Sequence, residues 1–175
     1  MHALPAHATT TTNVVTTGCL VASALLVAAI GIGPGVVAVL AVAAVAAIVD
    51  LRERRIPDEL VLIGAGVVAV MVTFGSASPA GVALGAASAA GPLLLIHLVS
   101  PAAMGFGDVK LALPLGAALG ALDPVLALVA LCIASAVTAA VGLARGRAAL
   151  PFAPGLVAGA ATASAVSFLT DWFPS

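Results

Sequence analysis

The stretch Met104-Gly105-Phe106-Gly107-Asp108-Val109-Lys110 stands where a polar loop turns into an apolar run, and a second carboxylate, Asp50, ends an earlier apolar run. Ionisable groups at membrane depth are costly, so they usually face the interior of a helix bundle or a wet cavity and serve a function there. Two aspartates at matching depths predict a two-carboxylate site. The rest of the chain is then the scaffold that brings Asp50 and Asp108 together.

The composition excludes a soluble globular domain. Of the 175 residues, 63% are hydrophobic and 7% are charged, whereas a soluble domain is roughly 25% charged. Apolar runs long enough to cross a bilayer follow one another, which predicts an all-α, polytopic membrane helix bundle embedded in the lipid bilayer. The net charge of -1 and the lack of a basic patch give no indication of nucleic-acid binding.

Glycine, proline and charged residues divide the apolar sequence into about seven helices. We expect residues 1–13 to be a disordered polar tail and residues 14–175 to be a single membrane domain with a core of about residues 36–172. The expected helices cover about residues 14–32, 36–50, 58–74, 79–99, 107–121, 125–144 and 152–172. Pro92 is expected to break or kink the fourth helix. Because no Lys or Arg precedes the first helix, it is interpreted as retained and not as a cleaved signal peptide.

The basic residues predict the orientation in the membrane. All of them fall in the connection between the second and third helices, at the start of the fifth, and between the sixth and seventh. They are Arg52, Arg54, Arg55, Lys110, Arg145 and Arg147. Alternating helices put these three places on one side, which the positive-inside rule makes cytoplasmic. Asp50 and Asp108 then both lie at the cytoplasmic boundary.

Two neighbouring carboxyl groups suit the hydrolysis of a peptide bond. An ionised carboxylate draws a proton from water, while a protonated one polarises the scissile carbonyl. Placing two carboxylates close together raises the pKa of one of them, because both cannot easily ionise side by side, and the pair titrates jointly. The alternative is a small proton-coupled transporter in which the same aspartates carry protons. It predicts aspartates near the midplane and a path open to both sides.

The segments Asp50-Leu51-Arg52-Glu53-Arg54-Arg55-Ile56-Pro57 and Gly105-Phe106-Gly107-Asp108-Val109-Lys110-Leu111 together resemble the type IV prepilin peptidases, which belong to the GxGD class of intramembrane aspartyl proteases. Pro151-Phe152-Ala153-Pro154-Gly155 is similar to the last conserved segment of that family. The resemblance covers about residues 36–160 and implies that Asp50 and Asp108 are the catalytic pair. The supporting motif residues are Gly105, Gly107, Pro57 and Lys110. We expect neither a metal ion nor another cofactor.

The resemblance implies an aspartic-type endopeptidase of the inner (cytoplasmic) membrane. Its substrates would be type IV, Flp/Tad-like prepilins or pseudopilins, whose short basic class III leader is cleaved at the cytoplasmic face. Larger members carry an N-terminal region with paired CxxC motifs that methylates the new N-terminus. Because no CxxC precedes the core here, we expect the compact form, without methyltransferase activity. The individual prepilin and the oligomeric state stay open.

The chain departs from the family pattern at Asp58, where the family usually has asparagine after Ile-Pro. This third carboxylate either shifts the titration of the pair or caps the helix that starts there, and we favour the cap. His97, about one turn from the cytoplasmic end of the fourth helix, is more typical of a packed histidine than of a site residue. Lys110 is interpreted as an anchor at the membrane interface.

Glycine spacing predicts where helices approach closely. The pairs Gly81-xxx-Gly85, Gly116-xxx-Gly120 and Gly155-xxx-Gly159 place small residues on one helix face, which is typical of close contacts between transmembrane helices.

Overall fold

The protein is described from a computed structural model, in which residues 33–146 and 150–172 are placed. This part of the chain contains six helices and no strand. The helices are α2 (Pro34–Glu53), α3 (Asp58–Thr73), α4 (Pro79–Val99), α5 (Phe106–Gly120), α6 (Pro124–Arg145) and α7 (Ala153–Trp172). The predicted all-α fold is confirmed. The predicted tail and the helix expected at 14–32 lie outside the described residues.

The ends of the helices follow from local sequence chemistry. Proline stands in the first turn of α2, α4 and α6, where its missing N–H has no helical partner to lose. The Ser78 hydroxyl accepts a hydrogen bond from the Gly81 N–H at 3.1 Å at the start of α4. At the start of α6, the Asp123 carboxylate accepts one from the Val125 N–H at 2.7 Å. Both are side-chain N-caps that satisfy free donors.

The fourth helix is not broken at its internal proline. α4 runs from Pro79 to Val99 with Pro92 inside it, so of the predicted break or kink the break is wrong and the kink stays a prediction. Proline removes one hydrogen bond to the preceding turn, but membrane helices tolerate this because neighbouring groups satisfy the freed carbonyl.

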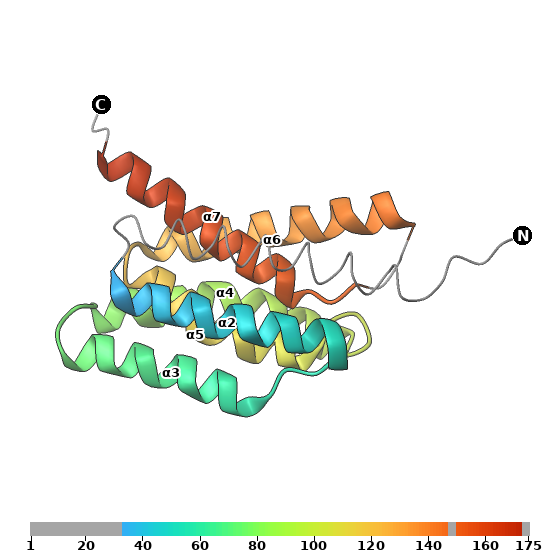
Figure 1. The fold of residues 1–175 in the computed structure, drawn as a ribbon, viewed down its shortest axis with the longest axis horizontal. Coiled ribbons are helices and arrows are strands. Elements are labelled where there is room, and N and C mark those ends of the chain that lie inside the picture. The colour runs from blue at the N-terminus through green and yellow to red at the C-terminus, as the bar shows by residue number, and fades with distance from the viewer. Residues whose placement is uncertain (1–32, 147–149, 173–175) are drawn as a thin grey trace, which may run out of the picture.

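The helices pack as a group of four with a pair against it. α2, α3, α4 and α5 lie side by side, and α6 and α7 lie along one side of that group (Figure 1). The closest pairs are α4 with α5 and α6 with α7. α5 is the most enclosed element, because its residues from Leu115 to Gly120 are all buried. The start of α5, which carries Asp108, is therefore held by a helix at the centre of the bundle.

Glycine lets α4 and α5 touch through their backbones. A Cβ atom built on Gly81 would lie 2.5 Å from the carbonyl oxygen of Gly120, and one on Gly85 would fall on the carbonyl oxygen of Gly116. Similarly, a Cβ on Gly159 in α7 would meet the backbone of α6 at Ala130. The close approaches predicted from glycine spacing are confirmed, and no larger side chain fits at these positions without moving a helix.

Several helices are suited to cross a membrane. α2, α4, α6 and the part of α7 from Ala153 to Thr170 are long and apolar enough. α3 and α5, with 16 and 15 residues, are slightly shorter than the ~17 residues that span a typical bilayer core. Large apolar side chains such as Leu62, Phe74 and Leu95 are exposed on the outside of the bundle, which suits contact with lipid. The protein is a multi-pass membrane protein.

Candidate active site

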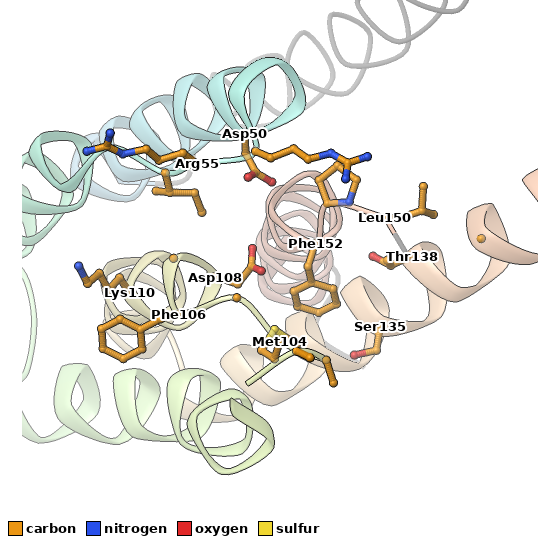
Figure 2. A pocket seen from close by; sticks show the side chains of 18 of the residues that line it. Asp50, Arg55, Met104, Phe106, Asp108, Lys110, Ser135, Thr138, Leu150 and Phe152 are labelled. Atoms are coloured by element: carbon orange, nitrogen blue, oxygen red, sulfur yellow. The ribbon is translucent and has the colours of Figure 1, made fainter. Parts of the chain in front are cut away.

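Asp50 and Asp108 meet at one end of the bundle. Asp50 lies in the last turn of α2 and Asp108 in the first turn of α5. Both line a cavity of about 1210 Å³, across which their carboxylates point toward each other (Figure 2). The negative charge of Asp50 acts on the Asp108 carboxyl group. The structure thus places the two predicted site residues in one cavity.

The walls of the cavity come from four parts of the chain. The connection from α2 to α3 forms one wall and the loop that leads into α5 forms another. One face of α6 and the segment before α7 complete it. The lining residues, apart from the two aspartates, are Arg54, Arg55, Ile56, Asp58, Ala102, Ala103, Met104, Gly105, Phe106, Gly107, Lys110, Ser135, Thr138, Ala139, Gly142, Leu143, Leu150, Pro151 and Phe152.

The turn after Asp50 directs the chain toward α5. Arg54 ends α2 in a left-handed conformation with a φ of 53°, which is uncommon for a residue with a Cβ. Its N–H donates a hydrogen bond to the carbonyl oxygen of Asp50 at 2.8 Å, and its positive charge acts on the Asp50 carboxylate. This turn brings Ile56 down onto Gly107. A Cβ atom built on Gly107 would lie 3.4 Å from the Cβ atom of Ile56.

The Asp108 carboxyl group is enclosed and incompletely hydrogen-bonded. Its Oδ1 atom is buried and has no hydrogen-bond partner among the described residues. A buried acceptor without a partner costs about 1–3 kcal/mol, and such atoms in native structures call for a functional explanation. The other carboxylate oxygen, Oδ2, has room because residue 105 is a glycine. A Cβ atom built on Gly105 would lie 3.2 Å from Asp108 Oδ2.

Asp58 and Lys110 form an ion pair beside the catalytic candidates. The N-cap of α3 is Pro57, without a side-chain cap, so the interpretation of Asp58 as a cap is wrong. Instead, its Oδ1 accepts a hydrogen bond from Lys110 Nζ at 2.8 Å. Proline at 57 fixes the extended backbone that leads into α3, and the carboxylate that follows it is left free to reach across to α5.

His97 stands behind the cavity wall. Its Nδ1 is 2.8 Å from the carbonyl oxygen of Met104, and its ring centroid is 5.3 Å from that of Phe106. Both partners line the cavity, whereas His97 does not. This agrees with the interpretation of His97 as a packed histidine.

The sequence did not single out the wall contributed by α6. Ser135, Thr138 and Gly142 are three and four residues apart and share one helix face, and Figure 2 shows Ser135 and Thr138 beside the cavity. Small and hydroxylated residues are common in membrane helices, so this spacing alone is a weak signal. Pro151 and Phe152, from the segment that resembles a family motif, also reach the cavity.

Among the described residues, the side chains that could hold a metal ion do not cluster. In residues 33–146 and 150–172, no group of three or more His, Cys, Asp or Glu side chains is close enough to hold one.

Comparison with known protein families shows to which family the chain belongs. The pattern of the type IV leader peptidase family matches residues 37–143, which is more than half of the chain and includes both aspartate motifs. The chain belongs to the type IV leader peptidase family. The segment at 151–155 lies beyond the matched residues of this peptidase, so its resemblance to a family motif stays a prediction. No curated protein and no solved structure matches the chain.

Proposed function

We propose that this leader peptidase is an aspartic-type endopeptidase in which Asp50 and Asp108 jointly activate a water molecule. The proposal rests on one observation: the two carboxylates point toward each other across one cavity (Figure 2). Family membership supports peptidase activity on prepilins. We infer that the substrates are type IV, Flp/Tad-like prepilins or pseudopilins with a class III leader.

The chemistry requires the pair to hold one proton between them. The ionised carboxylate takes a proton from water as the water oxygen attacks the scissile carbonyl carbon, and the neutral carboxyl group donates a hydrogen bond to the carbonyl oxygen. When the tetrahedral intermediate collapses, the C–N bond breaks and the leaving amine takes a proton from the pair. Two carboxylates that share a site favour the singly protonated state. The proton belongs to the pair and is not assigned to one residue.

The cavity is suited to a peptide. Its volume of about 1210 Å³ exceeds the ~300–1,000 Å³ of a typical small-molecule site. Apolar side chains such as Met104 and Phe152 line it together with the carboxylates. A chain segment of several residues therefore fits between the walls, with a peptide bond reaching the aspartates.

The basic residues support a cytoplasmic site. Arg54, Arg55 and Lys110 line the cavity, and Arg52 and Arg145 lie in the last turns of α2 and α6. At the other end of the bundle, the described connections at 74–78 and 121–123 contain no Lys or Arg. By the positive-inside rule the cavity end faces the cytoplasm, and the membrane is the cytoplasmic (inner) one.

The decisive test replaces each aspartate by its isosteric amide. We expect Asp50→Asn and Asp108→Asn each to lower kcat for prepilin cleavage by at least ~1,000-fold, because an amide neither accepts the proton nor shares it. The matched control is Asp123→Asn at the opposite end, where asparagine caps α6 about as well as aspartate. Cleavage of a purified prepilin in detergent, followed by mass spectrometry, is the measurement. Near-wild-type processing by either amide variant would refute the two-aspartate mechanism.

The orientation has its own test. In a background with Cys19 and Cys132 replaced by serine, Arg54→Cys should react with a membrane-impermeant maleimide only after the cells are opened. Ser76→Cys, in the connection between α3 and α4, should react in intact cells. Labelling of both positions in intact cells would contradict the proposed topology.

A measurement of proton flux distinguishes the proposed peptidase from the alternative, a proton-coupled transporter. Both aspartates lie in end turns of their helices, which supports a peptidase more than a midplane proton relay. Proteoliposomes that hold the purified protein should show no proton flux beyond that of the Asp108→Asn variant.

A further inference from the structure

A chain of side-chain contacts crosses the bundle beside the cavity. His97 in α4 packs on the ring of Phe106, and Lys110 Nζ lies 5.2 Å from the centroid of the same ring, within the range of a cation–π contact. Lys110 then donates its hydrogen bond to Asp58 at the start of α3. These four residues, which we call the contact chain, connect α4, α5 and α3.

The contact chain and the reacting carboxyl group use different faces of α5. Phe106 and Lys110 are four residues apart and therefore lie on the same side of the helix. Asp108 lies two residues from each, about 200° around the axis, and turns toward Asp50 (Figure 2). A rotation of the first turn of α5 that broke the contacts of Phe106 and Lys110 would also turn Asp108 away from Asp50.

Asp58 is connected to Asp50 by a short and constrained segment. Between them lie the end of α2, the left-handed Arg54 and the buried Ile56, which is 8% exposed. Pro57, with a φ of −64°, restricts the last link before α3. The ion pair therefore fastens the segment that follows Asp50 to the helix turn that carries Asp108.

We propose that Asp58 and Lys110 are positioning residues, which set the separation and orientation of Asp50 and Asp108 through the contact chain. The inference rests on the proposed aspartic mechanism for its effect on the reaction. Its structural content, a fixed distance between the α2–α3 connection and the loop before α5, stands apart from that mechanism.

The ion pair contributes little to overall stability. The side chains of Lys110 and Asp58 are 35% and 66% exposed, and exposed ion pairs are worth about 0–1 kcal/mol. Loss of the pair should therefore leave the fold intact. Catalysis is more sensitive, because misplacement of reacting groups by 1 Å can cost ~100-fold in rate.

The first experiment measures coupling between the two residues. Asp58→Asn and Lys110→Met should each lower kcat about threefold to tenfold with KM changed by less than about twofold. The double variant should be no worse than Lys110→Met alone, because Asp58→Asn removes only the charge from a contact that Lys110→Met already removes. Lys110→Arg, which keeps the charge and reach, should restore most of the activity.

Glu59 provides the matched control. It is exposed, lies in the same turn of α3 as Asp58, and makes no ion pair within the described part of the chain. Glu59→Gln removes the same charge, so it should leave kcat unchanged, and its effect should add to that of Lys110→Met. If Glu59→Gln is as damaging as Asp58→Asn, the effect is general electrostatics and the proposal is wrong.

The second experiment measures the distance between two walls of the cavity and does not depend on enzyme activity. Nitroxide labels on Arg55→Cys and Ala102→Cys, both exposed and both at the cavity, report the distance between its two walls by double electron–electron resonance. With Cys19 and Cys132 replaced by serine, the distribution should broaden with Asp58→Asn or Lys110→Met. It should stay narrow with Lys110→Arg or Glu59→Gln.

The two readouts separate the possible failures. An unchanged distance distribution in Asp58→Asn and Lys110→Met, or additive effects of the two on kcat, would overturn the positioning role. If the wild-type protein cleaves no prepilin, the proposed function fails, whereas a broadened distribution in the same variants would still support the contact chain.

Discussion

The two sides of α5 are held in different ways. Against α4, glycines bring the two backbones into direct contact at Gly85 and Gly116. Toward α3, at the site end, the described contacts across the helix are the ion pair of Lys110 with Asp58 and the packing of Ile56 on Gly107. The α4 side of α5 therefore has no freedom to shift, whereas the α3 side faces a cavity.

This difference divides the site into a half set by backbone contact, the fixed side, and a half held through side chains, which we call the adjustable side. Asp108 belongs to the α4–α5 pair, whose geometry is set by backbone contact. Asp50 belongs to α2 and the connection that follows it, which approaches α5 through side chains. The proposed mechanism needs the two carboxylates aligned and also needs room for a substrate to enter.

The largest expected effect comes from the fixed side. Gly85→Ala puts a methyl group onto the Gly116 carbonyl and 2.6 Å from the Gly120 Cα. These neighbours are backbone atoms that cannot turn away, so we expect a loss of about 3 kcal/mol or more in the free energy of unfolding. Thermal unfolding followed by circular dichroism in detergent is the measurement.

Gly91→Ala is the control in the same helix. Apart from its chain neighbours and the backbone of its own helix, no described atom lies within 4 Å of a Cβ built on Gly91, and alanine favours a helix interior by up to ~1 kcal/mol over glycine. This variant should be as stable as the wild type or slightly more so. Equal destabilisation by the two substitutions would show that the α4–α5 contact is not the fixed side.

A smaller effect is expected at the site itself. Gly105→Ala places a methyl group 3.2 Å from Asp108 Oδ2, so the carboxylate must move by a few tenths of an ångström. Gly105 has a φ of −67°, which alanine adopts without strain. We therefore expect an unchanged unfolding temperature and a fall in kcat of about tenfold. Cleavage kinetics and thermal unfolding of the same preparation measure both.

Gly107→Ala tests the adjustable side with the same chemical change. Its methyl group would make ordinary contact with Ile56, at 3.4–3.5 Å, and Ile56 borders the cavity. The loss of kcat should be smaller than for Gly105→Ala. If Gly107→Ala is the more damaging, then the α2–α3 connection is as rigid as the α4–α5 interface and the comparison between the two sides fails.

The pairing of Asp50 with Asp108 was predictable because each stands at the end of an apolar run. Helices that alternate across a membrane bring such ends to the same side. The glycine spacing predicted close approach for a similar reason, since small residues four apart share a helix face. These predictions depend on period and topology alone, and the structure confirms the close packing and brings the two aspartates into one cavity.

The ion pair and the α6 wall were not predictable in the same way. Asp58 and Lys110 are 52 residues apart, and the sequence does not reveal which charged side chains turn toward each other. Asp58 after a proline was compatible with a cap, but a lysine within reach bonds the carboxylate instead. Ser135 and Thr138 reach the cavity only because of the way α6 passes beside it, which depends on side-chain packing between helices.

The shortness of α5 has a consequence for the depth of the site. Gly120 packs opposite Gly81, so in an antiparallel pair the first residue of α5 comes level with about Leu95, and α4 continues to Val99. At 1.5 Å per residue, α4 extends about 6 Å beyond the start of α5. The first turn of α5, which carries Asp108, is therefore set back below the end of α4 and lines the cavity. Water in the cavity would meet a peptide bond there below the level at which α4 ends.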